Sequence, residues 1–304
     1  MRVGFIGIGA IGWPMAATLV KAGHDVSVYD VDGERLARFA AEHHCRAAGN
    51  LAEAAGNDFV VLMLPNGEIV RQVVLTDEDG AFMKAVRPGS VVIDMGSSDP
   101  LGTRALGAAL RMRGVALIDA PVSKRAAVFT ASGTPQATAT AIPMVIMLGG
   151  DDEGAIAKAK PLLAQIGDTL FETGGLGSGH AIKALNNYVS AASHVALGEA
   201  SLTAERFGLN IKTLIDVINV STGRSFVSEV LFKKQQENPD FKTGFSIGLF
   251  AKDIKNAVEL ISSVHLDAPV ARLVAERWAL ARDRVGAATD LTGAVPAWND
   301  DLPT

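Results

Sequence analysis

A lysine and an asparagine stand four residues apart in the second half of the chain, at Lys183 and Asn187. On a helix, side chains at this spacing point the same way. Their neighbours Ile182, Leu185 and Val189 are apolar, so we expect this helix to be largely buried. An amine among apolar neighbours loses solvation, which lowers the pKa of a lysine toward the range useful for proton transfer. The residues alone leave a second interpretation open, a surface lysine whose stem lies along apolar side chains while its amine stays in water.

A glycine-rich segment near the N-terminus, Gly7-Ile8-Gly9-Ala10-Ile11-Gly12, fits the G-x-G-x-x-G pattern of dinucleotide-binding loops. It follows an apolar run expected to form a strand and precedes a stretch expected to be helical. Gly7 would permit the tight turn, Gly9 would let the backbone approach a pyrophosphate, and Gly12 would allow close helix–strand packing. The helix N-terminus offers N–H groups and a positive dipole end to phosphates. We therefore expect Gly7, Gly9, Ile11 and Gly12 to contact a dinucleotide.

Asp30 ends the second expected strand, the position from which a carboxylate binds the ribose 2′-hydroxyl of NAD. A carboxylate there repels a 2′-phosphate, and the next residues, Val31, Asp32 and Gly33, include no arginine. The sequence therefore predicts NAD rather than NADP. A simple turn-forming role before Asp32 and Gly33 is the alternative interpretation of Asp30.

Two more strand ends are expected to line the same crevice, because ligands of open α/β sheets bind beyond the carboxyl ends of the strands. The first includes Leu64 and Pro65, and the second includes Ser97. Each of these motifs alone is also compatible with an ordinary loop. They support a cofactor site only together with the glycine-rich segment.

The order of patterns divides the chain into two parts. Short apolar runs at 3–6, 26–29, 59–64, 90–95, 115–120 and 144–148 alternate with helical stretches, which predicts a parallel sheet covered by helices on both faces. From His180 onward, long helical patterns cover 181–207, 211–220, 249–264 and 269–284, and the stretch after 285 shows little periodicity. We place the boundary at the glycine cluster 174–179. This gives an α/β Rossmann domain over 1–175 and an all-α domain over 176–304.

Composition limits the functional classes. The chain has 304 residues and a net charge of −5, which disfavours nucleic acid as a partner because phosphate binding needs a basic face. Its single cysteine excludes a disulfide within the chain, and no spacing of histidine and cysteine typical of a metal site is present. No uninterrupted apolar run reaches about 18 residues, and the N-terminus does not read as a signal peptide. We therefore expect a cytoplasmic protein without a membrane partner.

Five short motifs run through most of the chain. They are GIGAIGWPMA at 7–16, AGHDV at 22–26, DAPVS at 119–123, KALNN at 183–187, and Lys252-Asp253 with Phe245 before it. In these motifs and their order, the sequence resembles the β-hydroxyacid dehydrogenase family, of the 3-hydroxyisobutyrate dehydrogenase and tartronate semialdehyde reductase type. The resemblance implies a Rossmann domain joined by a long helix to an all-α domain that forms a homodimer or homotetramer interface. It also implies an NAD-dependent oxidoreductase that transfers a hydride between NAD(H) and a small hydroxy acid or semialdehyde acid.

The resemblance also implies roles for individual residues. Lys183 resembles the catalytic lysine, which is the general acid in reduction and the general base in oxidation. Asn187 corresponds to a side chain that helps hold the substrate, and Ser123, with the backbone amides after it, to the anchor of the substrate carboxylate. Lys252 corresponds to a cofactor contact near the nicotinamide, and Ser97 stands where the family has a threonine near that ring.

The chain departs from the family pattern after DAPVS. Lys124 and Arg125 replace two glycines, and the segment 124–143 is longer than the resemblance leads one to expect. Loss of the glycines limits positive φ angles, which reshapes the loop expected to bind the substrate carboxylate. Two cations beside the site favour a larger or doubly anionic substrate. The alternative is that both point to solvent.

Two other functions stay open at this point. One is an imine reductase-like NAD(P)H enzyme, although those relatives generally carry a different residue at the position of Lys183. The other is a protein that binds NAD without catalysis, and the presence of Lys183, Asn187 and Lys252 argues against it. His180 and His194 either relay protons to the site or serve the structure, and the structural role is the more common one at such positions.

Overall fold

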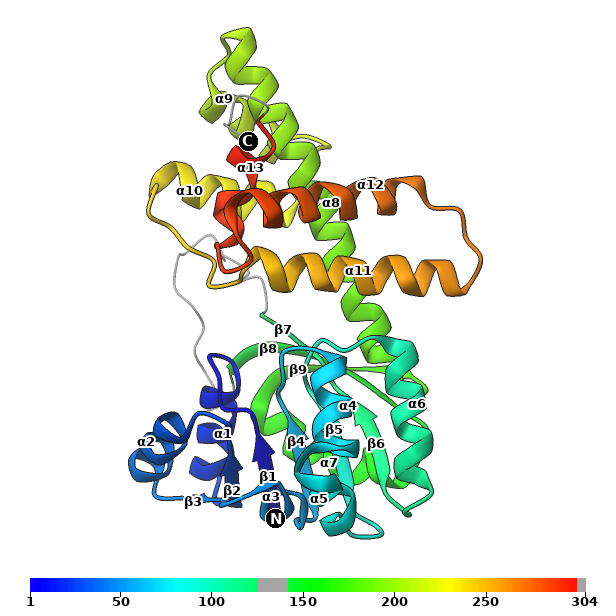
Figure 1. The fold of residues 1–304 in the computed structure, drawn as a ribbon. Helices are drawn as coiled ribbons and strands as arrows, with labels where there is room; N and C mark the ends of the chain where they lie inside the picture. Colours follow the sequence, from blue (N-terminus) through cyan, green and yellow to red (C-terminus); the bar gives the residue numbers. More distant parts are fainter. Residues whose placement is uncertain (125–141, 300–304) are drawn as a thin grey trace. The chain divides into compact units, whose positions relative to one another are not determined.

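The computed structural model describes residues 1–124 and 142–299. Contacts between residues divide the chain into two compact units, Met1–Lys183 and Ala184–Thr304. The division falls within one helix, α8 (Ser178–Phe207), so this helix belongs to both units (Figure 1).

The first unit is built on one sheet with the strand order β3-β2-β1-β4-β5-β6-β8-β7, and β9 pairs with β8. The strands are β1 (Arg2–Ile6), β2 (Asp25–Tyr29), β3 (Arg46–Ala47), β4 (Phe59–Leu62), β5 (Val91–Asp94), β6 (Ala116–Asp119), β7 (Val122–Lys124), β8 (Ile142–Gly150) and β9 (Gly167–Gly174). From β3 to β6 in this order, every pair of neighbours is parallel. Continuous apolar runs are typical of such strands, because both of their faces are buried.

The prediction of a parallel sheet is wrong at one end only. β8 runs antiparallel to β6, and β7 runs antiparallel to β8, whereas β9 is parallel to β8. A parallel neighbour needs a crossover connection, which is usually a helix. The described residues between β6 and β8 contain no helix, whereas α7 (Glu153–Ile166) connects β8 to β9.

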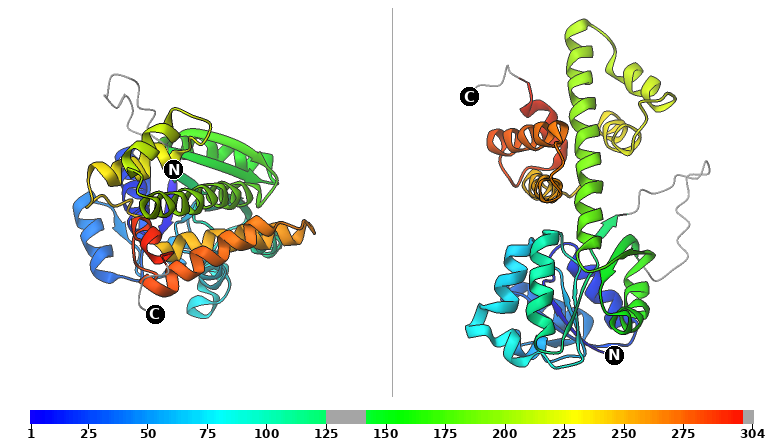
Figure 2. Two further views of the ribbon diagram at one scale, coloured as in Figure 1. Left: turned by 90° about the horizontal axis from the view of Figure 1, so that it is seen from above. Right: turned by 90° about the vertical axis from the view of Figure 1, so that its right-hand side faces the viewer.

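Helices cover both faces of the sheet, as predicted from the alternation of patterns. On one face lie α1 (Gly12–Lys21), α2 (Gly33–His43) and α7, and on the other lie α3 (Leu51–Ala55), α4 (Gly67–Leu75), α5 (Asp77–Ala85) and α6 (Pro100–Arg111). Figure 2 shows α6 and α7 on opposite sides of the strands. In β4, Val61 joins the first core cluster while Val60 and Leu62 join the second, as the alternation of side chains along a strand requires.

Apart from one isolated antiparallel bridge between Ser246 and Asp290, the regular structure described from Ala184 to residue 299 is helical, which confirms the predicted all-α domain. It comprises the rest of α8, α9 (Ile211–Asn219), a π-helix (Val227–Phe232), α10 (Lys233–Glu237), α11 (Ile247–Ser263), α12 (Pro269–Val285), a 3₁₀ turn (Leu291–Gly293) and α13 (Ala294–Ala297). Trp278 and Trp298 lie in its core, with their ring centroids 5.3 Å apart. Trp298 is buried although it belongs to the stretch with little periodicity. Within the described ranges, no helix combines the length and apolar character that crossing a bilayer requires.

Candidate active site

Four parallel strands end at one level of the sheet. The register pairs Ile6 with Leu62, Leu62 with Asp94, and Asp94 with Asp119, which are the last residues of β1, β4, β5 and β6. The loops that follow these strands therefore lie along one edge. The carboxyl ends of parallel strands are where ligands of such sheets bind.

The glycine-rich loop after β1 needs its first and last glycines for steric reasons. Gly7 has a φ of +94°, and a Cβ there would overlap the carbonyl oxygen of Met63. A Cβ on Gly12 would overlap the carbonyl oxygen of Gly7. Gly9 differs, because no atom of the described residues, apart from its own and those of its two chain neighbours, lies within 4 Å of a Cβ built there. The backbone at Gly9 is therefore open to a ligand.

The first turn of α1 is also open. Asp or Asn side chains cap α2, α3, α4, α6 and α7 by accepting a backbone N–H of the first turn. At α1 the N-cap residue is Ile11, whose side chain forms no such bond. First-turn donors without a side-chain cap, together with the positive end of the helix dipole, favour a phosphate. The loop therefore fits the pyrophosphate of a dinucleotide.

Asp30 directly follows β2 and is tied to the glycine-rich loop. Its Oδ2 accepts the backbone N–H of Ile8 at 2.9 Å, and its Oδ1 accepts that of Asp32 at 2.9 Å. The side chain is only 6 % exposed. A carboxylate offers about four lone-pair sites, so these bonds leave acceptor capacity for a ribose hydroxyl.

Arg35 is a neighbour of Asp30 that the sequence analysis missed. Its guanidinium lies 3.2 Å from Asp30 Oδ1 and 2.9 Å from Asp32 Oδ2. Arg35 stands in the first turn of α2, and its backbone N–H donates to the capping side chain of Asp32. The one sequence feature that pointed to Arg35 was the capping residue Asp32, because this cap places the first turn of α2 next to Asp30.

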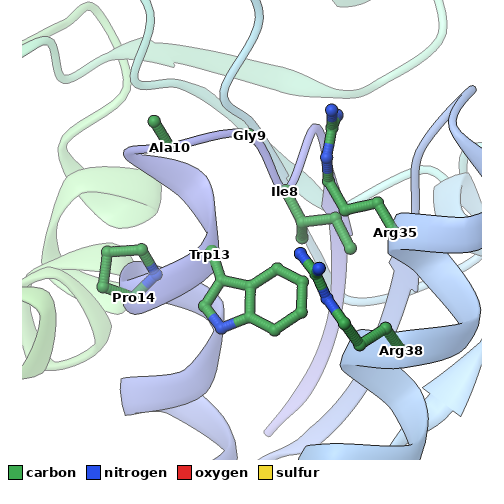
Figure 3. A pocket seen from close by; sticks show the side chains of 7 residues that line it. All are labelled: Ile8, Gly9, Ala10, Trp13, Pro14, Arg35 and Arg38. Atoms are coloured by element: carbon green, nitrogen blue, oxygen red, sulfur yellow. The ribbon is translucent and has the colours of Figure 1, made fainter.

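A cavity of about 270 Å³ lies beside the glycine-rich loop, between α1 and α2. Figure 3 shows the guanidinium group of Arg35 beside Ile8 and that of Arg38 between Ile8 and the ring of Trp13. Arg38 lies over the ring of Trp13, with its guanidinium carbon 4.8 Å from the ring centroid. Two cations thus stand next to the loop that fits a dinucleotide.

The loops after β4 and β5 contact each other. A Cβ on Gly96 would come within 2.7 Å of the carbonyl oxygen of Leu64. Asp94 holds the second loop, because its Oδ1 accepts the backbone N–H of Gly96 at 2.9 Å. Ser97 is half-buried, and Pro65 of the first loop is exposed. The structure therefore brings Leu64, Pro65 and Ser97 to the same stretch of the sheet edge.

The DAPVS motif begins at the end of β6 and continues into β7. Asp119 is buried, and its two oxygens accept the backbone N–H groups of Gly177 and His180, both at 2.8 Å. It therefore fixes the start of α8 to β6. Ser123 is half-buried in β7, in register with Val145.

The two cations predicted beside Ser123 fall at the border of the described part. Lys124 ends β7, where it pairs in register with Met144. Arg125 lies outside the described residues, as does most of the segment 124–143.

Lys183 is half-buried in the second turn of α8. The prediction that this helix is largely buried through Ile182, Leu185 and Val189 is wrong, because these side chains are 43 %, 38 % and 62 % exposed. The buried side of the helix carries small residues such as Ala184. Apolar residues at helical spacing mark a face, but their spacing does not say whether the same chain covers it.

Asn187 is buried in the second unit and hydrogen-bonded to Asp253. Its Nδ2 donates to Asp253 Oδ2 at 2.7 Å, and Oδ1 of Asp253 lies 2.9 Å from Nζ of Lys252. Because a carboxylate only accepts, the amide nitrogen must face Asp253. The amide oxygen accepts from Asn186 at 3.2 Å and keeps a second lone pair for a substrate group. Asp253 thus contacts two predicted site residues, Asn187 and Lys252, although it was not itself predicted as a site residue. The Lys252-Asp253 motif is the sequence feature that could have identified it.

His194 stands in an aromatic cluster. Its ring centroid lies 5.2 Å from that of Trp278 and 5.3 Å from that of Phe232. Burial lowers the pKa of His194 to about 4. A ring that stays neutral among aromatic side chains serves packing, which is the structural interpretation of this histidine.

Residues 2–175 match the NAD binding domain of 6-phosphogluconate dehydrogenase, and residues 177–298 match the NAD-binding part of NADP-dependent 3-hydroxyisobutyrate dehydrogenase. The chain belongs to the β-hydroxyacid dehydrogenase family. It is accordingly an oxidoreductase of the 3-hydroxyacid dehydrogenase type and uses a nicotinamide cofactor.

Relatives of this β-hydroxyacid dehydrogenase are similar over nearly their whole length. A probable 3-hydroxyisobutyrate dehydrogenase of Mycobacterium tuberculosis is 32 % identical, covering 91 % of this chain and 91 % of the relative. The 3-sulfolactaldehyde reductase of Escherichia coli is 30 % identical, covering 92 % and 90 %, and the 2-(hydroxymethyl)glutarate dehydrogenase of Eubacterium barkeri is 29 % identical, covering 98 % and 95 %. The solved structure of Mycobacterium tuberculosis 3-hydroxyisobutyrate dehydrogenase with L-serine has a TM-score of 0.82 at 30 % identity, covering 97 % of this chain and 98 % of that one. This likeness confirms the predicted fold.

Proposed function

We propose that this protein is an NAD-preferring dehydrogenase that transfers a hydride between NAD(H) and a small hydroxy acid or semialdehyde acid, with Lys183 as general acid and base. The observation that carries the proposal is the attachment of α8 to the edge that fits the cofactor. Asp119, at the end of β6, accepts two backbone N–H groups from the start of this helix at 2.8 Å. Lys183 follows one turn later on the same helix.

The residues of the first unit fit a nicotinamide dinucleotide. The open backbone of Gly9 and the uncapped turn of α1 would hold the pyrophosphate, and Asp30 would bind the adenosine ribose. When bound, the cofactor accepts a hydride from an alcohol carbon or returns it to a carbonyl carbon. By their family roles, Ser97 and Lys252 would contact its nicotinamide end.

Lys183 would move the proton that accompanies this reaction. In oxidation a neutral Nζ takes the proton of the substrate hydroxyl, and in reduction the ammonium returns a proton to the carbonyl oxygen. The amide oxygen of Asn187, held in place by Asp253, would orient the substrate hydroxyl. Ser123 and the amides after it would anchor the substrate carboxylate.

Replacement of Lys183 tests the proposal. We expect Lys183→Ala to lower kcat for the best hydroxy acid of a panel about 10²-fold or more. The Kd for NAD, measured by calorimetry, should stay within about twofold, because this amine acts on the substrate. Lys255→Ala is the matched control, since Lys255 is an exposed lysine of α11. Retained turnover in Lys183→Ala would contradict the assignment of the lysine.

The same panel separates the alternatives. It should include short hydroxy acids, aldehyde acids and cyclic imines, each followed by nicotinamide absorbance. Reduction of imines alone would favour an imine reductase, and NAD binding without any turnover would favour a non-catalytic NAD-binding protein.

We propose NAD over NADP because Asp30 directly follows β2, and a carboxylate at this position of the fold repels a 2′-phosphate. Arg35 weakens this repulsion, since it forms an ion pair with the same carboxylate at 3.2 Å. We expect kcat/KM with NAD to exceed that with NADP by about tenfold or more, which corresponds to about 1.4 kcal/mol. Equal values for the two cofactors would contradict this preference.

We propose a substrate that carries a second anionic group. Lys124 and Arg125 replace two glycines beside Ser123, and one relative is named for a glutarate, which is a dicarboxylate. In the double variant Lys124→Ala/Arg125→Ala, the KM for a doubly anionic hydroxy acid should rise more than the KM for a singly anionic one. Unchanged KM values would refute the substrate-charge idea.

We also propose that the protein forms a homodimer or homotetramer. Val264, Leu266, Val270 and Leu273, around the connection of α11 to α12, are each between 57 % and 66 % exposed. A group of large exposed apolar side chains is typical of a surface that another protein chain covers. Light scattering coupled to size-exclusion chromatography measures the assembly, and a monomer at micromolar concentration would contradict the proposal.

A further inference from the structure

A buried histidine ring in the first turn of α8 contacts groups from three other elements. Nδ1 of His180 lies 2.8 Å from Oγ1 of Thr103 in α6 and 3.8 Å from Oδ2 of Asp119 at the end of β6. Its Nε2 lies 3.8 Å from Oδ2 of Asp94 at the end of β5. The imidazole and both carboxylates are buried. The chemistry assigned to Lys183 makes no use of this ring.

The hydrogen bonds fix how the ring is held. Oγ1 of Thr103 lies 3.0 Å from the carbonyl oxygen of Asp99 and shares a hydrogen bond of 2.8 Å with Nδ1 of His180. The backbone N–H of His180 donates to Asp119 Oδ2 at 2.8 Å. This residue is therefore tied to α6 through its side chain and to β6 through its backbone.

The surrounding contacts leave the first turn of α8 little freedom. Asp94 also accepts the hydroxyl of Ser98 at 2.6 Å, which ties it to the loop after β5. Asp119 also accepts the backbone N–H of Gly177 at 2.8 Å. Gly179 packs so closely on β8 that a Cβ there would overlap the carbonyl oxygen of Met147. In a close-packed interior, such contacts allow neither sliding nor rotation of the turn without breaking bonds.

Lys183 lies one turn farther along the same helix. Three residues advance an α-helix by about 4.5 Å and nearly complete a turn, so His180 and Lys183 are neighbours on one side of α8. A shift of the first turn would carry the amine with it, and a misplacement of about 1 Å can lower a rate about 10²-fold.

We propose that His180 is a positioning residue. Its bond to Thr103 fixes the first turn of α8 on the strand ends and thereby sets the place of the Lys183 amine. This inference rests on the proposed function of Lys183.

Three variants separate positioning from packing. His180→Leu removes the bond, Thr103→Val removes it from the α6 side, and His180→Gln keeps a side-chain amide that both donates and accepts toward the threonine hydroxyl. We expect kcat for the best hydroxy acid to fall about tenfold or more in the first two variants and to recover largely in His180→Gln. KM and the calorimetric Kd for NAD should stay within about threefold. The double variant His180→Leu/Thr103→Val should lose no more than the worse single variant, because both changes remove the same bond.

His194→Ala is the matched control, because it truncates another buried histidine of α8 and should lower the Tm without lowering kcat. A lower Tm in His180→Leu with kcat within about twofold of the unchanged chain would overturn the inference. The inference would also be overturned if the fold-decrease in kcat of the double variant equalled the product of the decreases in the two single variants. If Lys183→Ala abolishes turnover in the same assay, the proposed function stands even when this inference falls. A chain that turns over no member of the panel would overturn both.

Discussion

Protonation of His194 should make the folded chain less stable in mild acid. Burial among Phe232, Trp278 and Trp298 lowers its pKa to about 4 from the ordinary value of 6.5. As the pH falls, the unfolded chain therefore binds this proton first, so the free energy of unfolding declines below about pH 6.5 until the folded pKa is reached. Between pH 7.5 and pH 5.0, these two pKa values give a loss of about 2 kcal/mol from this one residue.

Urea unfolding at the two pH values measures this loss. His194→Leu removes the titrating group and keeps a side chain of similar size. The chain has three tryptophans, so a Trp13→Phe background leaves Trp278 and Trp298, both in the core of the second unit, as fluorescence reporters. At about 1–3 kcal/mol per molar urea, acid should lower the unfolding midpoint roughly 1 M more with the histidine than without it.

The two chains differ only at residue 194, so acid effects of the carboxylates cancel in the comparison. If both chains lost the same free energy between pH 7.5 and pH 5.0, the histidine would not be the cause and the reasoning would be refuted.

The remaining predictions concern the cofactor loop and the buried carboxylates. Gly12→Ala places a Cβ on the carbonyl oxygen of Gly7. We therefore expect the Tm to fall by roughly 4 °C or more and calorimetric NAD binding to be lost. Normal NAD binding would contradict the close packing of Gly12 against Gly7. Asp253→Leu leaves the buried amide of Asn187 without its hydrogen-bond partner, so kcat/KM for the hydroxy acid should fall about tenfold. The decrease should be smaller in Asp253→Asn, which keeps an acceptor oxygen. Equal decreases in the two variants would contradict a role for this hydrogen bond. Asp30→Ala should raise the calorimetric Kd for NAD about tenfold and leave that for NADP nearly unchanged, and the reverse order would remove Asp30 from the ribose site.

The edge that fits the cofactor could be predicted from the sequence because short-range features determine it. Buried parallel strands read as continuous apolar runs, and the residues that follow them, such as Gly7, Asp30 and Ser97, must then share one edge. The direction of β8 could not be predicted in the same way, since an apolar run reads alike in parallel and antiparallel strands. Only its hydrogen-bond partners decide that direction.

Features that depend on which helix face meets a neighbour were missed. Arg35 contacts Asp30 because the Asp32 cap fixes which residues of α2 face the end of β2. A search limited to the residues immediately after β2 overlooks Arg35. Ile182 and Val189 have the spacing of a core-facing stripe but are exposed, because spacing is the same for a covered and an uncovered face. The burial of Trp298 depends on long-range packing, of which a short stretch without periodicity carries no sign.

The helix α8 continues without interruption across the boundary between the two units. Lys183 is the last residue of the first unit, and Asn187 belongs to the second unit. Four residues of α-helix advance about 6 Å and turn about 400°. The spacing between the amine and the amide is consequently a property of a single rod, whatever the arrangement of the two units. The loops, the cores and the angle between the units can change in related chains, while the spacing of residues 183 and 187 along α8 stays the same. Insertion of one residue into that turn would swing the amide by about 100° and separate the two groups.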